Sequence, residues 1–95
     1  MVDKPRITIT TTPSGFIEIW MNPAGRELLV SRIMALNERN EYLHFGERED
    51  IELSPRAYRP EDRVHEWGKL YLRLDEWDKK YFPLVFAPND ESSEV

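Results

Sequence analysis

The sequence predicts an α+β fold in which one main helix packs on an antiparallel sheet of five to six strands. Residues 22–40 combine a strong helix start signal with apolar side chains at helical spacing. The segments on either side alternate apolar and polar side chains, which is the pattern of strands with one buried face. Short turns between neighbouring strands favour antiparallel pairing. The predicted order is β-β-α-β-β, a long loop and β-β. We expect all strands to form one sheet, because one helix on one sheet is the simplest packing that buries the apolar faces.

The length of the chain limits the number of domains that it can form. Ninety-five residues are expected to form one domain, which we place at residues 1–86, and there is no cysteine to form a disulfide. Hydrophobic residues make up 40% of the sequence, which is enough for a globular core. Residues 87–95 are acidic and polar, and we expect them to form a disordered tail.

The first two predicted strands, at residues 6–12 and 16–21, form a hairpin. The first strand has β-branched residues at period two, and the segment from Pro13 to Gly15 suits a tight turn. The second strand carries apolar side chains on both faces. Its two alternating sets are Ile17, Ile19 and Met21 on one face, and Phe16, Glu18 and Trp20 on the other. Only one of these sets can face the helix.

The helix begins with an asparagine followed by a proline. The side chain of Asn22 can accept a hydrogen bond from a free N–H of the first turn, and Pro23 lacks an N–H at a position where none is needed. Leu29, Ile33 and Leu36 then recur at helical spacing. These signals predict a helix that lies on the core.

Four further strands are predicted after the helix. They cover residues 41–46, 51–53, 68–75 and 81–86. Residues 55–67 form a long connection, with one short helical turn beginning at Pro60. Residues 77–80 form a turn. Pro83 places the last strand at a sheet edge, because proline cannot donate a hydrogen bond to a ladder.

The composition argues against several function classes. The formal net charge of −5 argues against nucleic acid as a partner, because phosphate binding needs a basic surface. No stretch approaches the roughly 20 apolar residues of a membrane span, and no signal peptide is recognisable, so we expect a cytoplasmic protein with no membrane partner. His44 and His65 lack metal-ligand spacing, and no serine lies in a nucleophile motif. We therefore expect no enzymatic activity, no catalytic residue, no metal and no cofactor.

Aromatic side chains give the clearest functional signal. Trp20, Tyr42 and Tyr71 fall on one face of the sheet if the isoleucine and leucine sets of their strands face the helix. Together with Phe16 and His44, they would form an exposed patch. Such patches mark protein interfaces, where tyrosine and tryptophan are enriched.

Two alternatives remain open for these aromatic residues. In the first, the loop at residues 55–67 covers them and contributes Tyr58 and Trp67, which makes a second small core. In the second, the same face pairs with its counterpart in a homodimer. Both alternatives would leave the aromatic face unavailable to another protein.

The run from Gly15 to Leu53 carries a further pattern. A hairpin precedes a helix that opens with glycine and carries leucines, a strand follows with a histidine between apolar residues, and a Glu-Leu-Ser sequence comes later. The residues concerned are Gly25, Leu28, Leu29, Leu36, Leu43, His44, Phe45, Glu52, Leu53 and Ser54. This pattern, which spans under half of the chain, resembles the small bacterial immunity proteins of the immunity protein 32 family. The resemblance implies a protein that neutralises a toxin partner in a polymorphic toxin system.

The leading hypothesis is a non-enzymatic protein-binding module, and in its narrower form an immunity protein that blocks a basic toxin through acidic complementarity. The expected contact residues combine aromatic anchors with an acidic turn: Trp20, Tyr42, His44, Tyr71, Glu47, Glu49 and Asp50. A structural or homo-oligomerising domain is the second hypothesis. The third is a small enzyme or ligand-binding protein that uses His44 with a nearby carboxylate.

Overall fold

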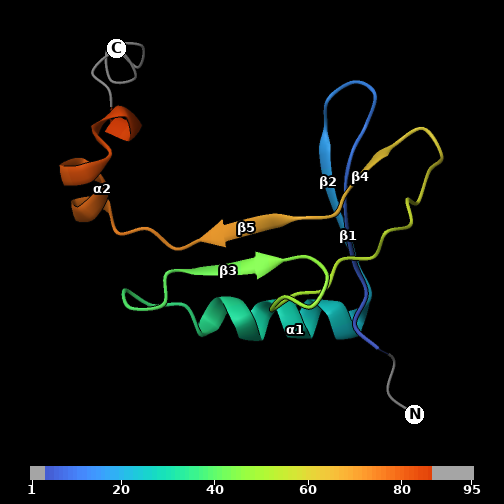
Figure 1. Ribbon diagram of the computed structural model, residues 1–95, viewed down its shortest axis with the longest axis horizontal. Helices are drawn as coiled ribbons and strands as arrows, with labels where there is room; N and C mark the ends of the chain where they lie inside the picture. Colours follow the sequence, from blue (N-terminus) through green and yellow to red (C-terminus); the bar gives the residue numbers. More distant parts are fainter. Residues whose placement is uncertain (1–3, 87–95) are drawn as a thin grey trace.

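The computed structural model describes residues 4–86 of the chain (Figure 1). Its elements, in order, are β1 (Ile7–Thr11), β2 (Ile17–Met21), α1 (Pro23–Met34), β3 (Tyr42–Phe45), β4 (Arg63–His65), β5 (Gly68–Tyr71), α2 (Asp75–Tyr81) and the 3-10 helix η1 (Pro83–Phe86). The fold class is α+β, as predicted. The predicted tail at residues 87–95 lies outside the described residues.

The strands form two antiparallel sheets, so the prediction of one sheet of five to six strands is wrong. The first sheet has the order β2-β1-β4, and the second pairs β3 with β5. Residues 51–53, predicted as a strand, make only an isolated parallel bridge between Ile51 and Phe45. The backbone N–H of Ser54 then donates to the carbonyl of Ile7 at 2.7 Å. This segment connects the two sheets and extends neither of them.

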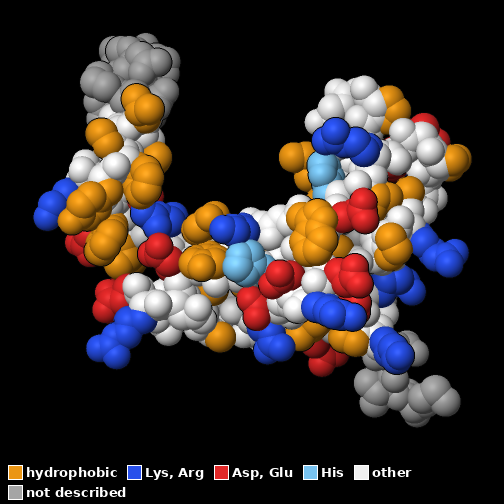
Figure 2. All heavy atoms as spheres, in the orientation of Figure 1, with side chains coloured by type: hydrophobic (Ala, Val, Ile, Leu, Met, Phe, Trp, Pro, Cys, Tyr) orange, Lys and Arg blue, Asp and Glu red, His pale blue; other side chains and the backbone are white. Residues whose placement is uncertain are grey.

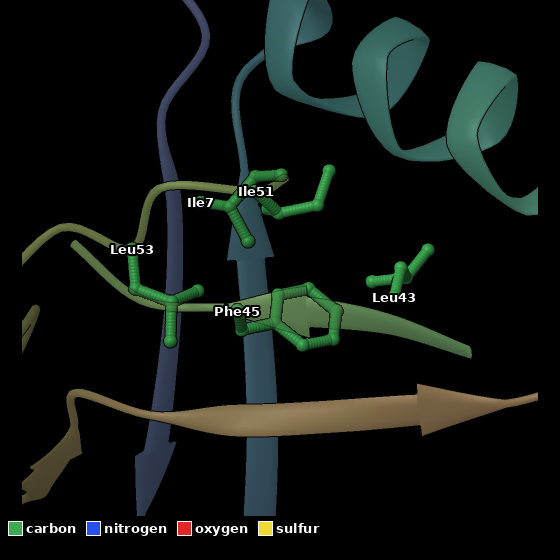
Figure 3. Packing of buried hydrophobic residues seen from close by; sticks show 5 residues of the cluster. All are labelled: Ile7, Leu43, Phe45, Ile51 and Leu53. Carbon is green, nitrogen blue, oxygen red and sulfur yellow. The ribbon is translucent and has the colours of Figure 1, made fainter. Parts of the chain in front are cut away.

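The buried core lies between the two sheets and α1 (Figure 3). Its buried apolar residues are Ile7, Leu43, Phe45, Ile51 and Leu53. Three leucines on the helix side pack against this cluster: Leu28, Leu29 and Leu36. The predicted apolar face is confirmed for Leu29 and Leu36, whereas Ile33 is exposed.

The start of α1 is fixed as the sequence predicts. Asn22 Oδ1 accepts hydrogen bonds from the backbone N–H of Gly25 at 2.7 Å and from that of Arg6 at 2.9 Å. Asn22 therefore caps the helix and also ties it to the beginning of β1. Glycine is needed at position 25, because a Cβ there would lie 2.5 Å from the carbonyl oxygen of Arg6.

The end of α1 comes earlier than predicted, at Met34 instead of residue 40. Asn37 Oδ1 accepts hydrogen bonds from the backbone N–H of Arg39 at 2.8 Å and from that of Asn40 at 3.0 Å. A short polar side chain that satisfies backbone donors in this way stabilises a turn in competition with the helix.

The C-terminal part departs furthest from the prediction. β5 ends at Tyr71, and the region predicted as a strand end, a turn and a strand at residues 81–86 forms α2 and η1 instead. Carboxylates lie in the first turn of α2 and lysines in its last turn, which suits the helix dipole: Asp75, Glu76, Asp78, Lys79 and Lys80. Pro83 begins η1, where its missing N–H costs nothing.

The molecule has an open shape. α1 and the β3–β5 sheet form a slab, from which the β1–β2 hairpin with β4 rises at one end, and α2 with η1 at the other (Figure 1). The extents are 50 × 35 × 21 Å and the radius of gyration is 16.6 Å, whereas a compact domain of this length has about 12 Å. Among residues 4–86, no helix has the length and apolar character that a membrane crossing requires.

Candidate functional site: an exposed tyrosine face

The β3–β5 sheet has one buried face and one open face. Its register pairs Tyr42 with Tyr71 and His44 with Lys69. Alternation along the strands puts these four side chains on the same face, opposite the core residues Leu43 and Phe45. We call Tyr42, His44, Lys69 and Tyr71 the tyrosine face.

The side chains of the tyrosine face contact one another. The ring centroids of Tyr42 and Tyr71 lie 5.5 Å apart with a tilt of 39°. His44 meets the Tyr42 ring edge-on, with centroids 5.2 Å apart, and Lys69 Nζ lies 5.2 Å from the centroid of the same ring. Tyr42 and Tyr71 nevertheless remain 42% and 51% exposed. They are therefore ordered by their neighbours and still available to a partner.

Two carboxylates of the following turn lie beside this face. The backbone N–H of His44 donates to Asp50 Oδ2 at 3.2 Å, and His44 Nδ1 lies 3.6 Å from Glu49 Oε2. Gly46 and Arg48 have positive φ angles of 144° and 62°, which let the chain turn tightly enough to bring these carboxylates back to β3. The predicted contacts of His44, Glu49 and Asp50 are thus brought together.

An open hollow of about 540 Å³ adjoins the tyrosine face. Tyr42 and His44 form one side of it, and Trp77 of α2 lies on another. Three carboxylates and one arginine complete most of the lining: Glu38, Glu41, Asp50 and Arg39. Figure 2 shows that acidic side chains gather over the middle of the drawn face. The surroundings of the tyrosine face are therefore more acidic than basic.

Arg73 holds α2 against this hollow. Its Nη1 lies 2.9 Å from Glu41 Oε1, and its Nε donates to Asp78 Oδ1 at 3.0 Å. The guanidinium carbon also lies 5.0 Å from the centroid of the Phe82 ring. The hydrogen bond to Asp78 is the main cause that raises the pKa of Arg73 above its ordinary value. The guanidinium therefore stays charged and keeps the ion pairs that position α2.

Trp20 does not belong to the tyrosine face, because it lies on the other sheet. Its ring stacks on Tyr58 with centroids 4.3 Å apart and an interplanar angle of 10°, and its Nε1 donates to Thr10 Oγ1 at 3.1 Å. Thr8 and Thr10 are buried on the same side of β1. Trp20 therefore lies apart from Tyr42 and Tyr71 and is partly covered by Tyr58 of the loop. Trp67, the other residue expected in a second small core, is 63% exposed and lies elsewhere.

Arg59 fixes the covering loop. Its guanidinium pairs with Glu18 of β2 and, at 2.9 Å, with the buried carboxylate of Asp62. It also lies 5.3 Å from the centroid of the Trp20 ring. The hydrogen bond to Asp62 is the main cause that raises the pKa of Arg59. One arginine thus connects the loop to the sheet face that it covers.

Three other aromatic or acidic residues of the predictions lie away from the tyrosine face. Trp67 lies against Gly46, where a Cβ would meet its ring at 2.3 Å. Glu47 lines a separate depression with Glu66 and Trp67. Phe16 lies just before β2 and is exposed. The predicted single patch therefore divides among several places, and Tyr42, His44, Tyr71, Glu49 and Asp50 are the members that stay together.

Sequence reasoning missed three features of the surface. Lys69 belongs to the tyrosine face; alternation along the strand places it on the same side as Tyr71, but it was not among the predicted contact residues. Ile17 and Ile19, which face away from the covering loop, are 70% and 56% exposed. The apolar side chains of residues 77–85 lie on and between α2 and η1, where a turn at residues 77–80 and a strand at residues 81–86 were predicted.

Among residues 4–86, no group of three or more potential metal-ligating side chains occurs. His44 with Glu49 is the one histidine–carboxylate contact within 4 Å in that part of the chain, and both side chains are more than a third exposed. No known protein family, curated protein or solved structure matches this chain.

Proposed function

We propose that the chain is a non-enzymatic protein-binding module and that the tyrosine face is its contact surface. The observation that carries this proposal is the pair of exposed tyrosines on paired strands, with their rings held by each other, by His44 and by Lys69. Tyrosine is enriched among the residues that dominate binding energy at protein interfaces. Rings that are already ordered lose less conformational freedom on binding, which favours affinity.

The charges around the tyrosine face favour a basic partner. Glu38, Glu49 and Asp50 lie beside it, and the chain carries a net charge of −5. An acidic rim around aromatic anchors accelerates the encounter with a basic surface, and the anchors then slow dissociation. The narrower form of the proposal is an immunity protein whose partner is a basic toxin; it extends the sequence-based hypothesis for residues 15–53.

Affinity capture with matched variants tests the proposal. The wild-type chain and the Tyr42→Ser/Tyr71→Ser double variant are immobilised, and proteins captured from the native host are quantified by mass spectrometry at low and high salt. We expect a basic protein that the wild type retains and the double variant loses by about tenfold or more, since two interface tyrosines are removed. Its retention should fall at high salt, because the rim charges are screened.

Tyr58→Ser serves as the control, because Tyr58 has a similar exposed fraction and lies in the loop over the other sheet. It should leave capture unchanged, provided that circular dichroism shows a folded chain. The proposal is wrong if the double variant retains the same proteins as the wild type. For the immunity form, co-expression with the captured protein should restore growth to cells that the partner alone inhibits, and a harmless partner would exclude that form.

A further inference from the structure

The C-terminal projection is an apolar arm. We define the C-terminal arm as α2 and η1, residues 75–86, which rise from the slab beside β5 (Figure 1). Its large apolar side chains are exposed: Trp77, Tyr81, Phe82, Leu84 and Val85. Leu84 is 87% exposed, and hydrophobic side chains gather along this projection (Figure 2). A surface of this kind is typical of a segment that packs on a partner.

The opposite projection presents a second apolar surface. Ile17, Ile19 and Met21 of β2 point away from the covering loop, and Ile9 of β1 pairs with Ile19 in the register. We call Ile17, Ile19 and Met21 the isoleucine face, whereas Ile9 is half-buried and packs on the core cluster. In the described part of the chain, this side of the sheet has no element packed over Ile17 and Ile19, which remain mostly exposed.

The positions of the two surfaces suit a second copy of this chain. The arm and the β1–β2 hairpin, which carries the isoleucine face, rise from opposite ends of the slab on the same side (Figure 1). A twofold rotation exchanges these ends, so the arm of each copy meets the isoleucine face of the other, and both contacts form together. Neither apolar surface would then remain open.

Charges at the two surfaces are complementary. Arg63 of β4 flanks the isoleucine face, because it pairs with Thr11, which pairs with Ile17 on its other side. The first turn of the arm carries carboxylates, Asp75 and Glu76. In a reciprocal contact, these opposite charges would fall at the rim of the apolar surface, where they favour one orientation over others.

We propose that the chain forms a homodimer in which the C-terminal arm of each copy packs on the isoleucine face of the other. None of the four residues of the tyrosine face belongs to the arm or to the isoleucine face, although Trp77 of the arm also lines the hollow beside Tyr42 and His44. The dimer is therefore tested at Ile19 and Leu84, and the proposed partner binding at Tyr42 and Tyr71. In the dimer, the two projections of each copy would pack against those of the other. The core of the single chain is small, with five buried apolar residues among residues 4–86.

Single cysteines test the contact directly, because the natural sequence has none. Ile19→Cys and Leu84→Cys chains are purified separately, mixed, and oxidised gently. We expect a disulfide-linked pair of one chain of each kind, several-fold more abundant than the product of either chain alone. Val30→Cys is the matched control for Ile19→Cys, since Val30 is 53% exposed on α1 outside both surfaces; mixed with Leu84→Cys, it should link poorly.

Other outcomes would overturn the proposal. If Ile19→Cys alone links as well as the mixture, the hairpins meet each other. If the chain with both cysteines forms an internal disulfide and stays monomeric, the arm folds back on its own hairpin. Light scattering of the unmodified full chain must also show a dimer, and Ile19→Asp must raise its dissociation constant about tenfold or more while Val30→Asp leaves it unchanged. A monomer at every concentration removes the dimer and leaves the tyrosine-face proposal untouched.

Discussion

Two sheet faces of this molecule carry aromatic side chains; a loop partly covers one face, and the other is exposed. On the β2-β1-β4 sheet, Trp20 lies under Tyr58 and its ring N–H is satisfied by Thr10. On the β3–β5 sheet, Tyr42 and Tyr71 pair with each other and stay exposed. In both sheets, the alternation of side chains along the strands places these aromatic residues on one face.

The difference comes from the connections around the sheets and not from the strands. The chain between Ser54 and Asp62 returns across the Trp20 side, and Arg59 anchors it there. No described segment returns across the outer side of β3 and β5 in the same way, and the charged turn at residues 46–50 stops at its edge. A covered aromatic residue stabilises the fold, whereas an uncovered aromatic pair is free to bind.

The comparison first predicts a large loss of stability when Trp20 is removed. Trp20→Ala takes away the stacked ring and the hydrogen bond to Thr10, and it leaves a cavity under the loop. We expect the free energy of unfolding to fall by about 3 kcal/mol. Urea unfolding, followed by circular dichroism at a fixed protein concentration, measures this. A change below about 1 kcal/mol would mean that the loop does not cover Trp20.

A smaller loss is expected when the cover itself is changed. Tyr58→Ser removes the ring that stacks on Trp20 but leaves Trp20 and its hydrogen bond in place. We expect a loss of about 1 kcal/mol, which is the typical value of an aromatic pair. The fluorescence emission of Trp20 should also shift to longer wavelength, measured in a chain whose other two tryptophans are phenylalanine. An unchanged emission would show that Tyr58 does not shield the indole.

The strand hairpin and the start of the helix could be predicted because their signals are local. Alternation identified both strands, and Asn22-Pro23 identified the helix start, where the asparagine caps the first turn. The early end of α1 also has a local cause, because the turn at Asn37 competes with the helix. The leucines at residues 70–74 favoured a long strand, although the pairing with β3 ends at Tyr71.

The division into two sheets could not be predicted, because it depends on contacts between distant residues. β4 joins β1 across more than fifty residues, so that Thr11 meets Arg63. The second strand carried apolar residues on both faces, and alternation alone could not tell which set the loop would cover. The open side of the β3–β5 sheet was predicted for Tyr42 and Tyr71, since their neighbours Leu43 and Leu70 belong to the core side. Trp20 was misplaced because the prediction assumed one sheet.

The smallest effect on stability is expected at the open tyrosine pair. Tyr71→Ser removes an exposed ring and one cross-strand aromatic contact, and it should lower the free energy of unfolding by only about 0.5 kcal/mol. Tyr71→Phe keeps the ring and should change it even less. Urea unfolding of both variants beside Trp20→Ala places the two aromatic regions on one scale. A loss at Tyr71 as large as that at Trp20 would show that something covers the tyrosine face as the loop covers Trp20. A negligible loss, together with lost capture of a partner, would show that this face is kept for binding and contributes little to folding.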